Sequence, residues 1–180
     1  MSTAALEARL RDAIRSIGGH MDVWAVFEDA ELLRAVVAAL ADALEPLRVS
    51  KIVAVESRGF LLGGAVAAQL GVGFVAVRKP GSLFPGEKTT VLTAPDYRGN
   101  ETELRMLVRS VGVGDRVAMV DDWIEVGAQA LAIRELVESR GATFLGLATM
   151  VDQSHPGVAD ALPVLVSLVD GDSLDDGEES

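Results

Sequence analysis

Two adjacent carboxylates stand at the end of an apolar run near the middle of the chain. The run RVAMV (116–120) is followed by Asp121 and Asp122, and Glu125 adds a third carboxylate three residues further on. Negative charge at the end of a buried strand is unfavourable unless a partner binds there. Carboxylates in this position can hold sugar hydroxyls or the hydration shell of a magnesium ion. This segment therefore predicts a binding site.

Two further segments that carry charged residues and glycines also follow apolar runs. They are ESRG (56–59) and RKPG (78–81). Ligands of open α/β sheets bind beyond the carboxyl ends of the strands, so we expect both segments to meet DDWIEVGAQA (121–130) at one edge. Backbone N–H groups at a helix start bind phosphate, and Arg and Lys bind pyrophosphate. The combination is typical of a site for a phosphorylated sugar.

The elements that must position these segments follow from the apolar pattern. Residues 29–44 place apolar side chains on one helical face, with Asp29 as the N-cap. Short apolar runs bounded by glycine or proline predict buried parallel strands. Strands that alternate with helices imply a parallel, twisted α/β sheet flanked by helices. The expected helices are 3–17, 29–44, 60–70 and 127–139, and the expected strands are 51–56, 73–80, 116–120, 143–151 and 163–169.

Composition limits the possible classes of function. The 180 residues are 49% hydrophobic and include no cysteine, which suits one domain with a large core and excludes disulfides and thiolate sites. A net charge of −11 argues against nucleic-acid binding. No signal peptide or membrane-spanning run is evident, so we expect a soluble, cytoplasmic protein without a membrane partner. We expect residues 1–170 to form the single domain and residues 171–180 to be an acidic, disordered tail.

Three motifs in order give the chain a specific resemblance to a known family. VAVESRGFLLGGAVAAQLGVGFVAVRKPG (53–81) and GDRVAMVDD (114–122) resemble the E-S-R-G-F, R-K-P-G and D-D-x-x-x-T-G-G-T motifs of type I phosphoribosyltransferases, most like those of adenine phosphoribosyltransferases. The likeness covers roughly residues 20–152. It implies a Rossmann-like fold with a flexible flap at residues 82–100. It also implies a Mg²⁺-dependent transfer of the 5-phosphoribosyl group from phosphoribosyl pyrophosphate (PRPP) to a nucleobase, with release of pyrophosphate, in purine salvage.

The resemblance also implies roles for individual residues. Asp121 and Asp122 would hold the ribose hydroxyls and, through water, the metal ion. The expected pyrophosphate contacts are Ser57, Arg58, Gly59 and Lys79. The turn expected to bind the 5′-phosphate contains Val126, Gly127, Ala128 and Gln129. The expected base contacts are His20 and Met21, which replace Phe and Arg of the family, and Trp123, which would stack on the base. The family further implies a homodimer.

The phosphate turn departs from the family pattern. It reads E-V-G-A-Q instead of A-T-G-G-T, so Val126 and Gln129 replace two hydroxyl donors. Each lost hydrogen bond to a charged group costs roughly 1.5–3 kcal/mol. Glu125 stands where 6-oxopurine members of the wider family carry an Asp that faces purine N7, so we expect Glu125 to act as an acid or base. Asp96 falls where the family has a Glu that helps to move the base proton.

Two functions remain open on these observations. The first is an active purine-type phosphoribosyltransferase, which the three preserved motifs favour. The second is a non-catalytic protein on the same fold that binds PRPP or a nucleotide, which the altered turn favours. A third reading, a nucleoside triphosphatase, would rest on GSLFPGEKT (81–89), but an extra residue precedes Lys88 and no helical pattern follows. We treat that likeness as a coincidence.

Overall fold

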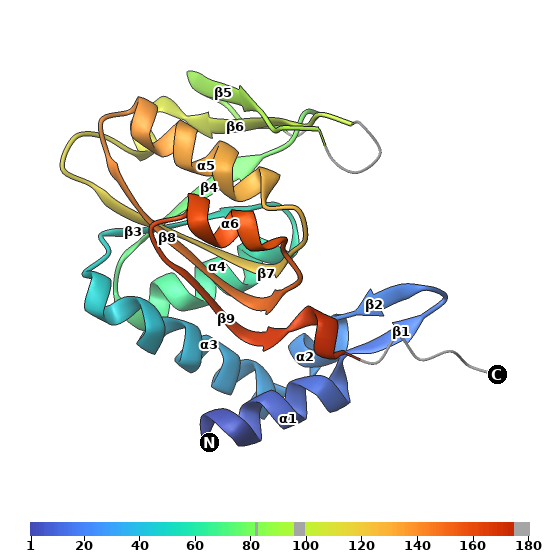
Figure 1. Cartoon of the computed structure of the whole chain (residues 1–180). Coiled ribbons are helices and arrows are strands. Elements are labelled where there is room, and N and C mark those ends of the chain that lie inside the picture. Colours follow the sequence, from blue (N-terminus) through green and yellow to red (C-terminus); the bar gives the residue numbers. More distant parts are fainter. Residues whose placement is uncertain (82, 96–99, 175–180) are drawn as a thin grey trace.

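The computed structural model of the chain describes residues 1–81, 83–95 and 100–174, and a seven-stranded twisted sheet forms its centre (Figure 1). The strands β4, β3, β7, β8 and β9 run parallel, whereas β6 and β5 are antiparallel to their neighbours. The predicted α/β class is confirmed. In spatial order the strands are β5 (Lys88–Leu92), β6 (Glu103–Leu107), β4 (Gly73–Arg78), β3 (Lys51–Val55), β7 (Arg116–Ile124), β8 (Thr143–Asp152) and β9 (Leu165–Asp170).

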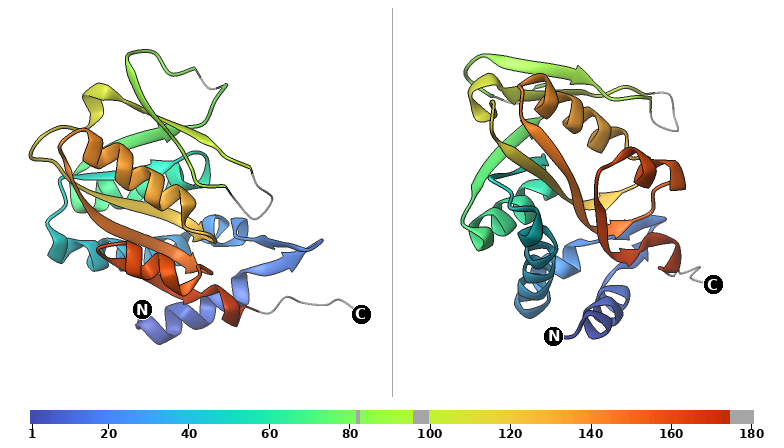
Figure 2. Two further views of the ribbon diagram at one scale, coloured as in Figure 1. Left: turned by 45° about the horizontal axis from the view of Figure 1, so that its top comes forward. Right: turned by 60° about the vertical axis from the view of Figure 1, so that its left-hand side comes forward.

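Helices cover both faces of this sheet, as the side views in Figure 2 show. One buried cluster packs α1, α3 and α4 against the sheet, and a second packs α5 and α6 against the opposite face. The helices are α1 (Thr3–Ala13), α2 (Trp24–Glu28), α3 (Ala30–Leu44), α4 (Arg58–Leu70), α5 (Ala128–Ser139) and α6 (Pro156–Ala161), with short 3-10 turns η1 (Glu45–Leu47), η2 (Val108–Ser110) and η3 (Gly171–Ser173). Within the described residues, no helix is long and apolar enough to cross a membrane.

Helix α3 illustrates how local chemistry sets the ends of an element. The Asp29 carboxylate accepts the backbone N–H groups of Glu31 and Leu32 at 2.9 and 3.0 Å, as an N-cap should. The Leu32 bond is the main reason why the pKa of Asp29 lies below its ordinary value. The helix ends at Leu44, and its apolar stripe is buried in the core. The sequence prediction for residues 29–44 is confirmed.

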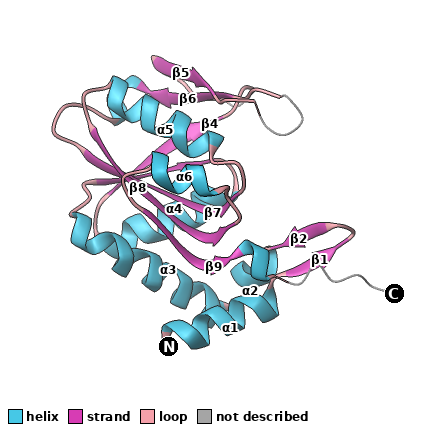
Figure 3. Cartoon of the chain, viewed as in Figure 1, coloured by secondary structure: helices cyan, strands magenta, loops and turns pink. Residues whose placement is uncertain are grey.

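The N-terminal region differs from the prediction of one long helix. Helix α1 stops at Ala13 because Ile14 takes up extended backbone and buries its side chain in the core. The residues that follow form a hairpin that projects from the body of the molecule, β1 (Arg15–Ile17) paired with β2 (His20–Asp22) (Figure 3). Gly18–Gly19 form its turn with positive φ angles of 58° and 77°.

Strand β5 is the second difference, since residues 82–100 were expected to be a flexible flap. Lys88–Leu92 pair with β6 over five residues, at the edge of the sheet. Lys88 starts this strand and donates to the carbonyl oxygen of Gly86 at 2.9 Å, so the segment is not a phosphate loop that leads into a helix. Residue 82 and residues 96–99 of the expected flap lie outside the described residues.

The C-terminal end of the fold lies beyond residue 170. Gly171–Ser173 form η3, and the Leu174 side chain is buried in the same core cluster as α1. Residues 171–174 of the segment expected to be an acidic tail therefore pack on the fold. Residues 175–180 lie outside the described residues.

Candidate active site

The carboxyl ends of β3, β4 and β7 meet at one edge and enclose a cavity of about 270 Å³. The sequence placed the three charged segments at this edge, and the structure brings them together there. The expected pyrophosphate contacts and the carboxylate pair line the same cavity: Ser57, Arg58, Gly59, Lys79, Asp121 and Asp122. Trp24, Trp123 and Gln129 complete its wall with Val55 and Glu56.

The sequence suggested that the two carboxylates follow the strand, but they lie within it, because β7 continues to Ile124. Residues Trp123 and Ile124 still pair with Val151 and Asp152 of β8. Adjacent residues of a strand point to opposite faces, so the paired Asp side chains have different surroundings. Each carboxylate must therefore be treated separately.

Asp122 is 4% exposed and is neutralised by Arg58. The Arg58 Nε atom lies 2.7 Å from Asp122 Oδ2, yet that oxygen accepts no aligned hydrogen bond. A buried carboxylate requires a cation nearby, and this ion pair links the start of α4 to β7. Arg58 is thus held at the mouth of the cavity by charge, with its donor groups available to an anion.

Asp121 is only partly exposed, and among the residues that the structure describes no cation lies within hydrogen-bond distance of its carboxylate. Its Oδ1 atom accepts the backbone N–H of Asp122 at 3.0 Å. Removal from water, together with the negative charge of Asp122, raises the pKa of Asp121 well above its ordinary value. A Cβ atom on Gly59 would lie 3.0 Å from the same Oδ1, so α4 approaches this carboxylate closely. Asp121 is therefore prepared to receive a cation or a hydroxyl donor.

Glu56 fixes the neighbouring backbone. Its carboxylate accepts from Arg78 Nε at 2.8 Å and from the backbone N–H of Lys79 at 2.6 Å. The Arg78 guanidinium also donates to the Leu83 carbonyl oxygen, so this residue braces the end of β4. The Glu56–Ser57 peptide bond is cis. The hydrogen bond from its backbone N–H to Glu56 holds Lys79 at the cavity that Ser57 also lines.

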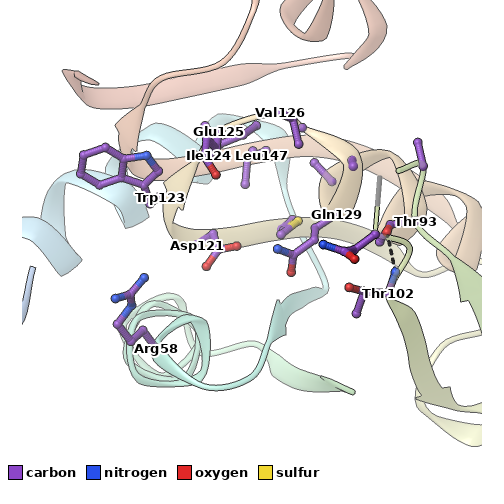
Figure 4. A pocket seen from close by; sticks show the side chains of 16 residues that line it. Arg58, Thr93, Thr102, Asp121, Trp123, Ile124, Glu125, Val126, Gln129 and Leu147 are labelled. Carbon is purple, nitrogen blue, oxygen red and sulfur yellow. Dashed lines mark hydrogen bonds between the residues drawn. The ribbon is translucent and has the colours of Figure 1, made fainter. Parts of the chain in front are cut away.

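The phosphate turn lines a second, adjoining cavity of about 300 Å³ (Figure 4). Gly127 has a φ of 68° and is the N-cap of α5, and Ala128 begins the helix without a positive φ. Figure 4 shows Asp121 and Gln129 pointing into this cavity, with Arg58 across from Val126. The start of α5 therefore offers backbone N–H groups and one carboxamide to an anion.

Thr93 and Thr102 reach the same cavity from outside the predicted motifs. The backbone N–H of Thr102 donates to Thr93 Oγ1 at 3.0 Å, which closes the base of the β5–β6 connection. Asn100 and Ala94 also line this side. No periodic signal marks this segment in the sequence, because β5 is an exposed strand at the edge of the sheet. The two threonines line the same cavity as Val126 and Gln129, which replace two hydroxyl residues of the family.

A third cavity, of about 330 Å³, adjoins the others on the side of the β1–β2 hairpin. It brings together the three expected base contacts, His20, Met21 and Trp123, with Glu125. Ser16 and Gln153 line it as well, and the sequence analysis missed both. Arg58 and Trp123 line all three cavities, so the cavities form one continuous site. Asp96, the other expected acid or base, lies outside the described residues.

Comparison with known proteins finds relatives that are adenine phosphoribosyltransferases. The chain is 37% identical over 153 residues to the adenine phosphoribosyltransferase of a Synechococcus species. The aligned region covers 84% of this chain and 88% of that protein. The chain is 38% identical over 133 residues to the adenine phosphoribosyltransferase of Anaeromyxobacter dehalogenans, with 74% and 76% covered. No model of a protein family matches the chain.

Solved structures share the whole fold. The adenine phosphoribosyltransferase of Rhodothermus marinus superposes with a TM-score of 0.82 at 31% identity, over 93% of this chain and 99% of that one. The enzyme of Saccharomyces cerevisiae, solved with an imino-altritol bisphosphate and adenine, gives a TM-score of 0.79 at 29% identity, with 92% and 99% covered. The fold is thus that of a type I phosphoribosyltransferase, an enzyme of the glycosyltransferase class. Within that class, the chain belongs to the adenine phosphoribosyltransferase family.

Proposed function

We propose that this enzyme transfers the 5-phosphoribosyl group of PRPP to a purine base, with adenine preferred, and releases pyrophosphate. The observation that carries the proposal is the continuity of the three cavities through Arg58 and Trp123. A sugar with a phosphate at one end and a pyrophosphate at the other needs two anion sites on either side of a hydroxyl-binding site. The base needs a third space beside the sugar. The three cavities offer these spaces in one connected volume.

The pyrophosphate end of PRPP fits the cavity between β3 and β4. Lys79 and Arg58 would supply positive charge, and the start of α4 at Ser57 and Gly59 would supply backbone N–H groups. The 5′-phosphate would lie against the start of α5, with Gln129 as a side-chain donor. The ribose between them would place its hydroxyls on Asp121 and Asp122. Catalysis would then rest on positioning and on stabilising the charge of an oxocarbenium-like transition state.

A magnesium ion fits this donor set when substrate is present. Within the described part of the chain, no group of three or more His, Asp or Glu side chains could hold a metal ion by itself. Two carboxylates are enough for Mg²⁺, which usually keeps several waters and takes further oxygens from substrate phosphates. Asp121 and Asp122 would hold it, through water, beside the ribose hydroxyls. The ion would supply positive charge to the leaving pyrophosphate.

Glu125 lines both the cavity that we propose for the 5′-phosphate and the cavity that we propose for the base. We expect it to exchange a proton with the purine during transfer. Glu125→Gln should therefore lower kcat by about a hundredfold at saturating substrates, with little change in KM for PRPP. Initial rates of nucleotide formation measure this. Glu135→Gln on the exposed side of α5 is the matched control and should behave as wild type. An unchanged kcat in Glu125→Gln would remove this role.

The comparisons favour transfer over the non-catalytic alternative, because the relatives are named as transferases over most of this chain's length. The altered turn keeps a left-handed glycine at a helix start, which preserves the backbone part of a phosphate site. We further propose, from the family alone, a cytoplasmic homodimer that acts in purine salvage.

Pyrophosphate release from PRPP, with Mg²⁺ and with adenine, hypoxanthine or guanine, tests the proposed function. We expect release that depends on a base, with adenine fastest, and AMP as the product detected by mass. Reactions without base and without Mg²⁺ are the controls. Saturable PRPP binding in calorimetry without any nucleotide product would instead support the non-catalytic alternative.

A further inference from the structure

Gln153 has features that the proposed mechanism does not use. It follows β8 at the sheet edge, is half-buried, and lines the base-side cavity beside Trp123 and Glu125. Among the residues that the structure describes, none forms a hydrogen bond with its carboxamide. A carboxamide has two N–H donors and a carbonyl acceptor, so at the wall of a cavity it can donate to a ligand and accept from it at once. An amide without a partner at the wall of a cavity is prepared for a ligand.

The stem of Gln153 is fixed although its amide end is not. Its backbone N–H donates to the carbonyl oxygen of Ile124 at 2.9 Å, which ties the residue to the end of β7. On the other side, a Cβ atom added to Gly171 would lie 2.7 Å from Gln153 Cβ and 3.1 Å from Cγ. The stem therefore packs directly on the backbone of η3. A fixed stem reduces the entropy that ordering the amide on a ligand would cost.

The surrounding groups suggest a planar ligand with polar edges. Trp123 and Met21 offer an aromatic and a flexible apolar surface, whereas Glu125 can only accept hydrogen bonds when ionised. Adenine carries an amino donor next to a ring-nitrogen acceptor, and one carboxamide can pair with both at once. In the same pose guanine presents the O6 acceptor where adenine has its amino donor, and N1–H where adenine has a ring-nitrogen acceptor, so guanine would need the carboxamide turned end for end. A carboxylate at this position could instead accept from both the N1–H and the 2-amino group of guanine.

We propose that the Gln153 carboxamide reads the edge of the base and sets the preference for adenine. It donates to a ring nitrogen and accepts from the amino group, while Trp123 packs on the face of the ring. This inference rests on the proposed function, because it takes the third cavity as the base subsite. It assigns specificity to the end of β8, outside all three sequence motifs.

Two substitutions test the role of Gln153. Gln153→Leu keeps the volume but removes the polar group, so KM for adenine should rise about tenfold with KM for PRPP unchanged. Gln153→Glu keeps the shape but removes the donor, so the ratio of kcat/KM for guanine over adenine should rise at least tenfold. Gln69→Leu, at an exposed position of α4, is the matched control and should change neither value. Thermal unfolding checks that each variant is folded.

Calorimetric titration of each variant with adenine and with guanine, in the presence of pyrophosphate, gives a second readout that needs no turnover. Unchanged base affinity and unchanged base preference in both folded variants would overturn the inference. If the wild type binds adenine but forms no nucleotide, the proposed function fails, and weaker adenine binding by Gln153→Leu would still support the inference. A wild type that binds no purine would overturn both.

Discussion

Asp121→Asn should lower kcat/KM for PRPP by about a hundredfold to a thousandfold and should at the same time raise the melting temperature at neutral pH. The expected loss of activity follows from the proposed role, because asparagine keeps the shape but removes the charge that faces the ribose hydroxyls and the metal ion. The expected gain of stability follows from the surroundings. Asp121 lies next to the buried Asp122, and Arg58 is already paired with Asp122. Within the described part of the chain, the negative charge of Asp121 is therefore not neutralised by an ion pair of its own.

The pH dependence of this effect has a definite sign. The folded chain holds the proton of Asp121 more tightly than the unfolded chain, because burial and the Asp122 charge raise its pKa. Its favourable contribution to stability is therefore complete below the ordinary carboxyl pKa and is lost as the pH rises through the raised value. Asp121→Asn should unfold at a higher temperature than wild type above that range, and the difference should vanish in acid. Melting curves from acid to neutral pH measure this.

Asp115→Asn is the matched control for the pH dependence. The Asp115 carboxylate accepts from Lys51 Nζ at 2.8 Å, and this bond is the main reason why the pKa of Asp115 lies below its ordinary value. Its stabilising contribution is present above the ordinary carboxyl pKa, so this variant should melt lower at neutral pH and keep its activity. If Asp121→Asn also melted lower at neutral pH, the carboxylate would be stabilising, and the assignment of Asp121 as a strained functional charge would be wrong.

Much of the site could be predicted because parallel strands carry their carboxyl ends to one edge. Ser57 and Lys79 follow two separate strands and Asp121 lies near the carboxyl end of a third, so the parallel sheet brings all three residues to one edge. The turn expected to bind the 5′-phosphate could be predicted because it lies at the start of the expected helix 127–139. The sequence also held a signal for the β1–β2 hairpin, since Gly18–Gly19 is a typical two-residue turn. The hairpin was not predicted because the apolar residues of 3–17 have helical spacing, which favoured one long helix.

The remaining contacts could not be predicted because they depend on long-range pairing. Gln153 reaches the base-side cavity because β8 pairs with β7 up to Ile124, and no local pattern records that length. Thr93 and Thr102 reach the phosphate cavity because β5 and β6 lie antiparallel at the sheet edge. An edge strand with exposed side chains lacks the apolar alternation that would reveal it. These contacts therefore lie outside the three sequence motifs.

Gly127→Ala should lower kcat/KM for PRPP by about a hundredfold or more and destabilise the fold by roughly 2–5 kcal/mol. A φ of 68° costs an alanine roughly 1–2 kcal/mol, and the new Cβ atom would lie 2.4 Å from Val158 Cγ1 of α6. Overpacking of this kind costs roughly 1–3 kcal/mol more, and the turn must shift to relieve it. A shift of the backbone that we propose to hold the 5′-phosphate would displace the ribose from its reactive position. Urea unfolding and initial rates measure the two effects.

The double variant Gly127→Ala/Val158→Ala separates crowding from backbone strain. Val158→Ala removes the two closest atoms, so it should restore part of the stability and much of the activity, while the cost of the left-handed backbone remains. Gly114→Ala is the control for strain alone, since its φ is 90° and a Cβ atom there would meet nothing within 4 Å. It should lose stability and keep its activity. If Val158→Ala recovered no activity in the double variant, contact with α6 would not be what positions the turn, and the left-handed conformation of Gly127 would by itself account for the phosphate site.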